Sequence, residues 1–142
     1  MIKHLFFASF LLSSISGTVM AECLDVKIAA QGREGTVLVG VYGTKNSFPK
    51  PGEHLVASRA ALTSGAVTMH FNDIPAGRYA LAAGIDENNN GKVDVNFFGV
   101  PSEPVSFSKG AKASMFGPPA FDDAALEVPA GKVCATSEIR FN

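Results

Sequence analysis

The sequence lacks any strong excess of charge. It contains 12 Lys and Arg against 13 Asp and Glu, and one of the basic residues, Lys3, lies in the leader described below. Proteins that bind nucleic acid or an anionic membrane through charge carry a clearly basic surface. The near-balance of charge therefore gives no indication of nucleic acid or of an anionic membrane as a partner.

The sequence also lacks the motifs of the common enzyme classes. It has no G-x-S-x-G, no H-E-x-x-H and no glycine-rich phosphate loop. Beyond residue 21 its only histidines are His54 and His70; we expect His70 to be exposed, with a metal pair formed by the two as the alternative. Asp122 and Asp123 are adjacent and would point to opposite sides of a strand. We therefore expect no enzyme, and a metal-dependent hydrolase is the least favoured alternative.

Residues 1–21 have the features of a secretory signal peptide. Lys3 precedes an apolar stretch over residues 5–12, and small residues allow cleavage after Ala21. The apolar stretch is too short, and too interrupted by Ser and Gly, for a membrane span, although a retained anchor is the alternative. We predict a periplasmic or secreted protein whose single domain, residues 22–142, has no membrane span after cleavage.

Only two cysteines are present, and they lie near the two ends of the predicted domain. In an oxidising compartment an even pair predicts a disulfide, here Cys23–Cys134, while two free buried thiols are the alternative. Alternation along the terminal strands places both thiols on solvent-side faces. The buried face of the last strand is then expected to be formed by Val133, Ala135, Ile139 and Phe141.

No stretch beyond the leader shows a sustained apolar period of 3.6, so long amphipathic helices are not expected. Short β-branched and apolar runs alternate instead with turns rich in Gly, Pro and Asn. This pattern predicts an all-β fold, an antiparallel sandwich of about seven strands that is immunoglobulin-like or prealbumin-like. We expect the first two strands to pair as a hairpin, as do the third with the fourth and the sixth with the seventh. The predicted strands are residues 23–31, 35–42, 54–62, 66–72, 79–85, 124–128 and 132–141.

A polar loop over residues 86–94, here called the 86–94 loop, follows the fifth predicted strand. Its oxygen-bearing groups recur at the spacing of a calcium-binding loop, and Gly91 permits the sharp turn. Phe97 occupies the twelfth position, where such loops have a bidentate glutamate, so any calcium affinity should be weak, about 10⁻⁴ to 10⁻³ M. The alternative is a turn whose side chains bind their own backbone. The candidate calcium ligands are Asp86, Asn88, Asn90, Asp94 and the carbonyl group of Lys92.

A long segment over residues 95–121 is rich in proline, glycine and phenylalanine and is predicted to be irregular. Its phenylalanines predict an apolar groove for a small ligand or a protein partner. The alternative is that they seat the segment on the sandwich. The candidate ligand-binding residues are Phe97, Phe98, Phe107, Phe116 and Phe121.

Four motifs in order, residues 71–79, 86–94, 96–103 and 116–124, resemble an uncharacterised family of exported bacterial proteins, domain of unknown function 2141. The Pro-Ala-Gly-Arg-Tyr entry to the fifth strand is also similar to that of transthyretin-like and carboxypeptidase regulatory-like sandwiches, which implies a prealbumin-type fold. The family has no established activity, so the resemblance implies location and fold. From the residues themselves we expect a non-enzymatic binding module that uses residues 95–121 beside the 86–94 loop. The alternative is a cell-envelope accessory domain that docks on another protein.

Overall fold

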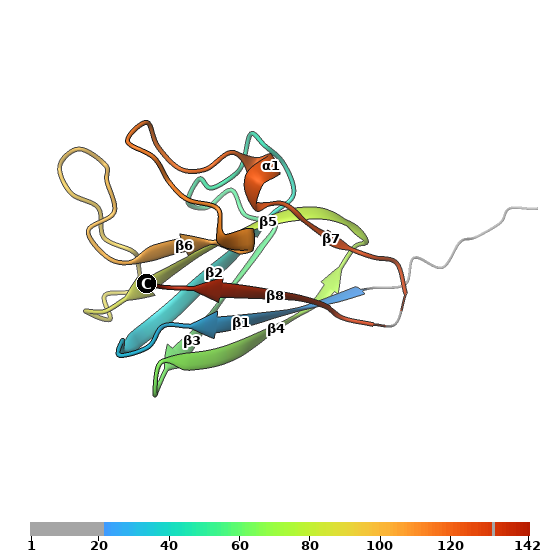
Figure 1. Cartoon of the computed structure of the whole chain (residues 1–142), viewed down its shortest axis with the longest axis horizontal. Coiled ribbons are helices and arrows are strands. Elements are labelled where there is room, and N and C mark those ends of the chain that lie inside the picture. Colours follow the sequence, from blue (N-terminus) through green and yellow to red (C-terminus); the bar gives the residue numbers. More distant parts are fainter. Residues whose placement is uncertain (1–21, 132) are drawn as a thin grey trace, which may run out of the picture.

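The computed structural model describes residues 22–142 except residue 132, and it shows an almost entirely β fold (Figure 1). Two sheets form an open sandwich, which confirms the predicted fold class. The predicted signal peptide lies outside the described residues. The eight strands, one more than the sequence predicts, are β1 (Glu22–Ala29), β2 (Gly35–Tyr42), β3 (Val56–Leu62), β4 (Ala66–Ile74), β5 (Gly77–Asp86), β6 (Val105–Phe107), β7 (Leu126–Val128) and β8 (Ala135–Arg140).

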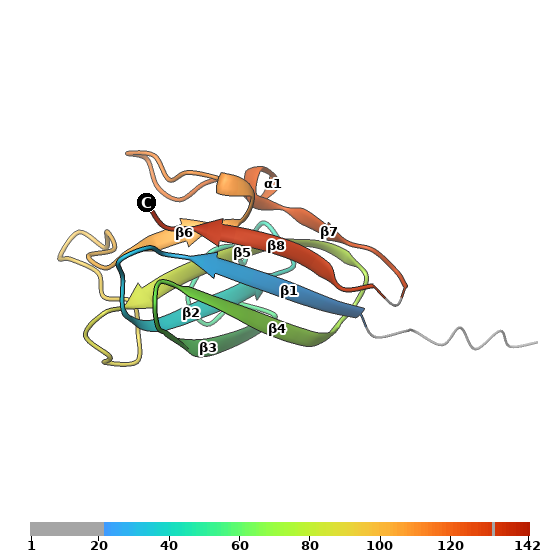
Figure 2. The same cartoon turned by 60° about the horizontal axis from the view of Figure 1, so that its bottom comes forward.

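The two sheets have the strand orders β4-β1-β8 and β3-β2-β5-β6, and β7 also pairs with β5. Figure 2 shows β1, β4 and β8 lying over β2 and β5. The predicted hairpins are wrong, because β1 and β2 belong to different sheets, as do β3 and β4. Both turns instead carry the chain across the sandwich, and the Ala30 amide donates a hydrogen bond of 2.7 Å from one crossing to the Gly65 carbonyl of the other. A glycine turn fits a crossing as well as a hairpin, and apolar alternation does not specify the partner strand.

The core between the sheets is built from the alternating apolar positions of the strands. Side chains two residues apart share one face of a strand, so the β-branched runs give each sheet one apolar face. The main buried residues are Leu24, Val26, Ile28, Val37, Val39, Val41, Met69, Phe71, Leu81, Ile85 and Ile139.

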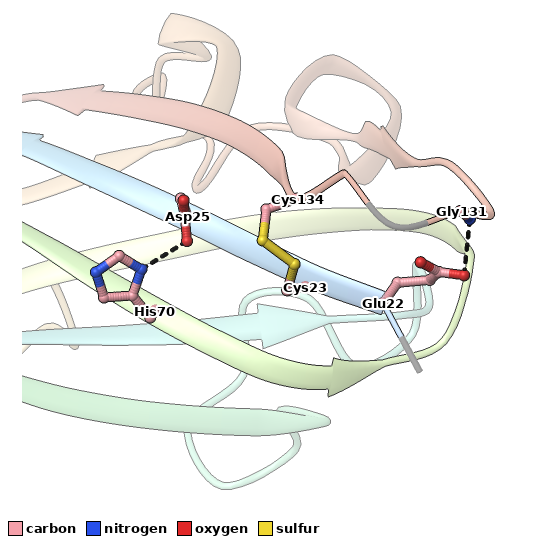
Figure 3. Close-up of a disulfide and its surroundings, with 6 residues drawn as sticks. All are labelled: Glu22, Cys23, Asp25, His70, Gly131 and Cys134. Carbon is pink, nitrogen blue, oxygen red and sulfur yellow. Dashed lines mark hydrogen bonds and ion pairs between the residues drawn. A yellow bond between two sulfur atoms is a disulfide. The ribbon is translucent and has the colours of Figure 1, made fainter. Parts of the chain in front are cut away.

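The terminal strands β1 and β8 pair in parallel, with Leu24 opposite Ala135. The same register places Cys23 beside Cys134, and the predicted disulfide is present, with the Cα atoms 4.5 Å apart (Figure 3). It spans a sequence separation of 111 residues, a loop that the chain-entropy model associates with about 4–5 kcal/mol of stability. Val133, predicted to face the core, is exposed because β8 begins only at Ala135.

The outer face of the three-stranded sheet carries polar side chains near the disulfide (Figure 3). His70 Nδ1 on β4 lies 2.7 Å from Asp25 Oδ1 on β1, and the His70 side chain is exposed, as the sequence predicts. At the end of β1, Glu22 Oε1 accepts a hydrogen bond of 3.0 Å from the Gly131 amide. These contacts link the first residues of β1 to β4 and to the turn at Gly131.

The closing pair predicted for residues 124–128 and 132–141 is also wrong. A single helical turn, α1 (Phe121–Ala124), precedes the short strand β7, and β7 pairs with β5 at residues 77–79. β8 pairs with β1 instead. Two adjacent acidic residues in the first turn of α1, Asp122 and Asp123, suit a helix start better than a strand.

Candidate binding site

β5 is the platform of the candidate site because it is buried on both faces. Its inner side chains enter the core, and its outer positions, Ala80, Ala82 and Gly84, are small enough for other segments to lie closely against them. A Cβ atom at Gly84 would lie 2.2 Å from Val93 Cγ2. Glycine at this position therefore lets the 86–94 loop fold back over the outer face of the sheet.

The 86–94 loop forms a hydrogen-bonded polar turn. The buried Asp86 carboxylate accepts the Asn90 amide on Oδ1 at 3.0 Å and the Gly91 amide on Oδ2 at 2.7 Å. Asn88 Oδ1 accepts the Asn90 amide at 3.1 Å, and Asn90 Oδ1 accepts the Lys92 amide at 3.1 Å. Each side chain thus replaces water as the partner of a backbone N–H group, as in Asx turns.

Asp94 closes the same turn. Its carboxylate accepts hydrogen bonds from the side-chain amide of Asn90, at 2.8 Å to both oxygens, and from that of Asn88 at 2.7 Å. These bonds, that from Asn90 first, hold the pKa of Asp94 below its ordinary value, with a smaller contribution from the charge of Lys92. The sequence-predicted calcium ligands are therefore brought together, with the amide nitrogens of Asn88 and Asn90 facing Asp94.

Glu103 lies outside this loop but binds it, a contact that the ligand spacing did not reveal. Its Oε1 accepts the Glu87 amide at 2.9 Å and the Asn88 amide at 3.3 Å, and its Oε2 accepts the Asp94 amide at 2.9 Å. Glu103 lies beyond the twelfth position of the loop, so only its place in the third family-like motif pointed to it. Across the described part of the chain, no three His, Cys, Asp or Glu side chains are arranged to hold a metal ion.

The first exposed tip, here defined as residues 95–101, is a tight turn with phenylalanines at its end. Asn96 Oδ1 accepts the amides of Phe98 at 2.9 Å and of Val100 at 3.1 Å, and the Asn96 amide donates to the Val100 carbonyl at 2.8 Å. Gly99 has φ of +77°, a conformation that glycine adopts without strain. Phe97 and Phe98 are 97% and 85% exposed, so the turn holds two apolar rings in water.

The second exposed tip, residues 114–117, repeats this arrangement. The backbones of Ser114 and Gly117 exchange hydrogen bonds of 2.8 and 3.1 Å, and Ser114 Oγ accepts the Phe116 amide at 3.2 Å. Phe116 is 93% exposed and Met115 is 91% exposed. Met115 was not among the sequence candidates, because the predicted groove rested on the aromatic side chains alone.

The other two candidate phenylalanines are buried. Phe107 and Phe121 pack with Phe48 on the outer face of β5, with ring centroids 5.9 and 6.1 Å from that of Phe48. The segment between the tips is therefore partly regular, containing β6 and the 3₁₀ turn η1 (Ser108–Gly110), whereas the sequence predicts it to be irregular. Phe107 and Phe121 seat this segment on the sheet and so follow the alternative interpretation.

A buried serine fixes the same segment. Ser108 Oγ accepts the Leu81 amide of β5 at 2.9 Å and donates to the Ala124 carbonyl of α1 at 2.5 Å. Because buried hydroxyls without partners are unfavourable, this arrangement joins three elements at one point. The two tips consequently project from a firmly held base.

A groove of about 820 Å³ runs beside β6 and the end of β8, between the two tip-bearing loops. Ser106 Oγ donates a hydrogen bond of 2.7 Å to the Arg140 carbonyl and so links the two strands beside the groove. The side chains lining it are a mixture of charged and apolar groups. Among them are Glu103, Val105, Phe107, Lys112, Glu138 and Arg140.

The family model described as "Uncharacterized protein conserved in bacteria (DUF2141)" matches residues 26–136. The chain belongs to this family. In this family member the matched region includes both tips, the 86–94 loop and the segment that joins the tips. Comparisons with curated proteins and with solved structures give no match. In the part of the chain that the structure describes, no helix is long and apolar enough to cross a membrane.

Proposed function

We propose that this protein is an exported, non-enzymatic binding module that holds its partner through the two exposed tips. The observation that carries the proposal is the near-complete exposure of four large apolar side chains on hydrogen-bonded turns. These are Phe97, Phe98, Met115 and Phe116. Burying such a side chain contributes about 1.5–3 kcal/mol, and exposed apolar clusters of this kind mark interaction sites.

The local structure of the tips supports a binding role for the exposed side chains. In each tip a side-chain oxygen, of Asn96 or of Ser114, accepts the backbone amide two residues ahead, and a glycine completes the turn. A turn that is already ordered loses little conformational entropy when a partner covers it. The apolar side chains are thus held in place before binding.

Export is part of the proposal, with the periplasm or the extracellular medium as the location. It is supported by the leader-like residues 1–21 and by the Cys23–Cys134 disulfide, which is of the kind that persists in oxidising compartments. The absence of catalysis is proposed because the polar groups near the tips are engaged with one another, in the 86–94 loop and at Glu103.

Photo-crosslinking tests the binding function directly. A benzophenone amino acid would replace Phe98 or Phe116 in the producing bacterium, with Leu55 as a matched control. Leu55 is also exposed, and its amide bonds to Val41, at the end of β2 away from the 86–94 loop. We expect the same adduct from both tips and none from Leu55; labelling no stronger at the tips than at Leu55 would refute the proposal.

The alternative role is that of an envelope accessory domain that docks on a protein. The groove between the tip-bearing loops favours it, because a segment of a partner would find charged and apolar groups there, including Lys112 and Val105. In the crosslinking experiment, an adduct with one protein that also labels position 112 would assign this role.

We also propose weak calcium binding at the 86–94 loop. It is supported by the convergence of two carboxylates, Asp86 and Asp94, with the side chains of Asn88 and Asn90. A calcium ion there would replace the amide donors at Asp94, so both amides would turn their oxygens inward and the Lys92 carbonyl would complete the set. An affinity of about 10⁻⁴ to 10⁻³ M is expected without a bidentate glutamate.

Thermal melts measure this calcium binding. Millimolar calcium should raise the melting temperature relative to chelator, because a ligand that binds only the folded state stabilises it. Asp94→Asn should abolish the rise, and Asp123→Asn should keep it. Asp86→Ala is a poorer test, because it also leaves the backbone amides of Asn90 and Gly91 without their hydrogen-bond acceptor. Identical melts with and without calcium would leave the loop as a plain polar turn.

A further inference from the structure

The two tips lie at one corner of the molecule. In both views the loops that carry them, residues 95–101 and 114–117, are the parts of the chain that project farthest on that side (Figures 1 and 2). Each tip is a narrow turn that ends in two apolar side chains, and the groove lies between the two loops. A single flat surface can therefore meet both tips at once.

The convex shape of the tips favours a deformable partner. A folded protein would need two separate hollows of matching depth, because well-packed interfaces require complementary shapes. The interfacial region of a bilayer accepts projecting phenylalanine and methionine side chains without preformed hollows, since apolar groups there lie at the boundary of headgroups and acyl chains.

The charges at this corner also suit a lipid surface. Its acidic side chains have partners within the protein: Glu87 pairs with Arg33 at 2.9 Å, Glu138 pairs with Arg140 at 3.1 Å, and Glu103 accepts backbone amides. These internal partners reduce the repulsion that the carboxylates would exert on an anionic surface.

The segment between the tips contains two lysines, which differ from these paired acidic side chains. Lys109 and Lys112 are exposed, and within the described residues neither forms an ion pair. Lys109 has φ of +58°, a backbone conformation that is unfavourable for a residue with a side chain. Lys109 directly follows the buried Ser108, so it lies at the base of the segment. Lys112 lines the groove between the tip-bearing loops, where an unpaired cation complements the phosphate groups of an anionic membrane surface.

We infer that the two tips insert into the headgroup region of an anionic phospholipid bilayer, with Lys112 facing the lipid phosphates. The inference rests on the proposed function and names the partner of the tips. The near-balanced charge of the whole chain does not oppose it, because insertion of the four apolar side chains supplies most of the attraction and Lys112 adds to it. Peripheral binding of this kind requires no spanning helix.

Single-tryptophan variants test the insertion, since the natural chain contains no Trp. Phe98→Trp and Phe116→Trp would each be mixed with vesicles of phosphatidylglycerol and phosphatidylethanolamine, with Leu55→Trp as the control. We expect a blue shift of emission, and quenching by brominated acyl chains, for both tip variants and not for the control. An unshifted spectrum at either tip, or equal quenching at position 55, would overturn the inference.

Co-sedimentation with the same vesicles gives the contribution of each group. Phe97→Ser/Phe98→Ser and Met115→Ser/Phe116→Ser should each lower the partition coefficient by about tenfold or more. Lys112→Gln should lower it by about fivefold, and this loss should vanish on phosphatidylcholine vesicles. If a variant with the serine substitutions at both tips partitions onto the vesicles as well as the natural chain, the inference is also overturned.

The outcomes separate this inference from the proposed function. If the vesicles do not bind the protein but both tips crosslink to one protein in the bacterium, the lipid inference is wrong and the binding module stands. If vesicle binding and tip-specific crosslinks are both absent, both proposals are wrong.

Discussion

Phenylalanines of one segment, residues 95–121, have opposite environments. Phe107 and Phe121 are buried against Phe48, whereas Phe97, Phe98 and Phe116 are almost fully in water. The residue type and the proline- and glycine-rich surroundings are the same in both groups, so neither explains the difference.

The surface that receives the ring makes the difference. On the outer face of β5 the side chains of Ala80 and Ala82 leave room, and Phe48, which Tyr42 contacts edge-on, supplies edge-on aromatic contacts to both rings. The tips have no such surface beneath them, since their turns extend beyond the sheet (Figure 1). The buried group therefore stabilises the fold, and the exposed group is available for a partner.

The largest expected effect on stability comes from truncating a phenylalanine of the buried group. Phe121→Ala should lower the free energy of unfolding by about 3–5 kcal/mol, because it removes apolar contacts and leaves a cavity. Phe116→Ala should change it by less than about 0.5 kcal/mol, as expected for an exposed side chain. Urea denaturation of both variants measures the contrast. Similar losses for both would show that the exposed tips also support the fold.

A smaller effect is expected where the 86–94 loop crosses the sheet. Gly84→Ala should lower the free energy of unfolding by about 1–3 kcal/mol, because the added methyl group overlaps the β-branched Val93 side chain. Hydrogen exchange at the Asn90 amide should also speed up, since the loop is displaced.

Two further variants serve as controls for Gly84→Ala. Gly43→Ala introduces a Cβ only 3.7 Å from Tyr79 Cε1, an ordinary contact, and should be far milder. In the Gly84→Ala background, Val93→Ala should restore much of the lost stability. An unrestored double variant would mean that backbone strain, and not the overlap, is responsible.

The smallest expected effect concerns the ion pairs that hold α1. Hydrogen bonds from Lys45, and then from Arg78, hold the pKa of Asp122 below its ordinary value. The stability contributed by such a group is present above the unfolded-state pKa of about 4 and is lost as the pH falls through the lower folded-state pKa.

Acid unfolding curves test this direction of the pH dependence. Asp122→Asn should flatten the fall of stability below about pH 4, where the unfolded state takes up more protons than the folded state. Asp123→Asn is the matched control, since the neighbouring carboxylate has no ion pair among the residues described. Equal flattening by both variants would contradict a specific role for Asp122.

The sequence predicted five strands closely, because alternation of apolar and polar residues is a local property. It could not predict β6, whose three residues lie among prolines and glycines and become a strand only by pairing with β5. It also misplaced the partners of β1 and β3, since pairing depends on contacts across the whole chain. Likewise Glu103 joined the 86–94 loop only through the folded path of residues 95–102.

By itself, the sequence determined that this chain forms a β-sandwich, that Cys23 and Cys134 form a disulfide, and that polar groups cluster at residues 86–94. These properties follow from side-chain period, cysteine number and turn chemistry, which act locally or leave one possible pairing. The tertiary structure alone decided that two of the five candidate phenylalanines support the sheet while the other three, like Met115, are exposed to water. Burial depends on which surface meets a side chain, and only the assembled sheets supply that surface.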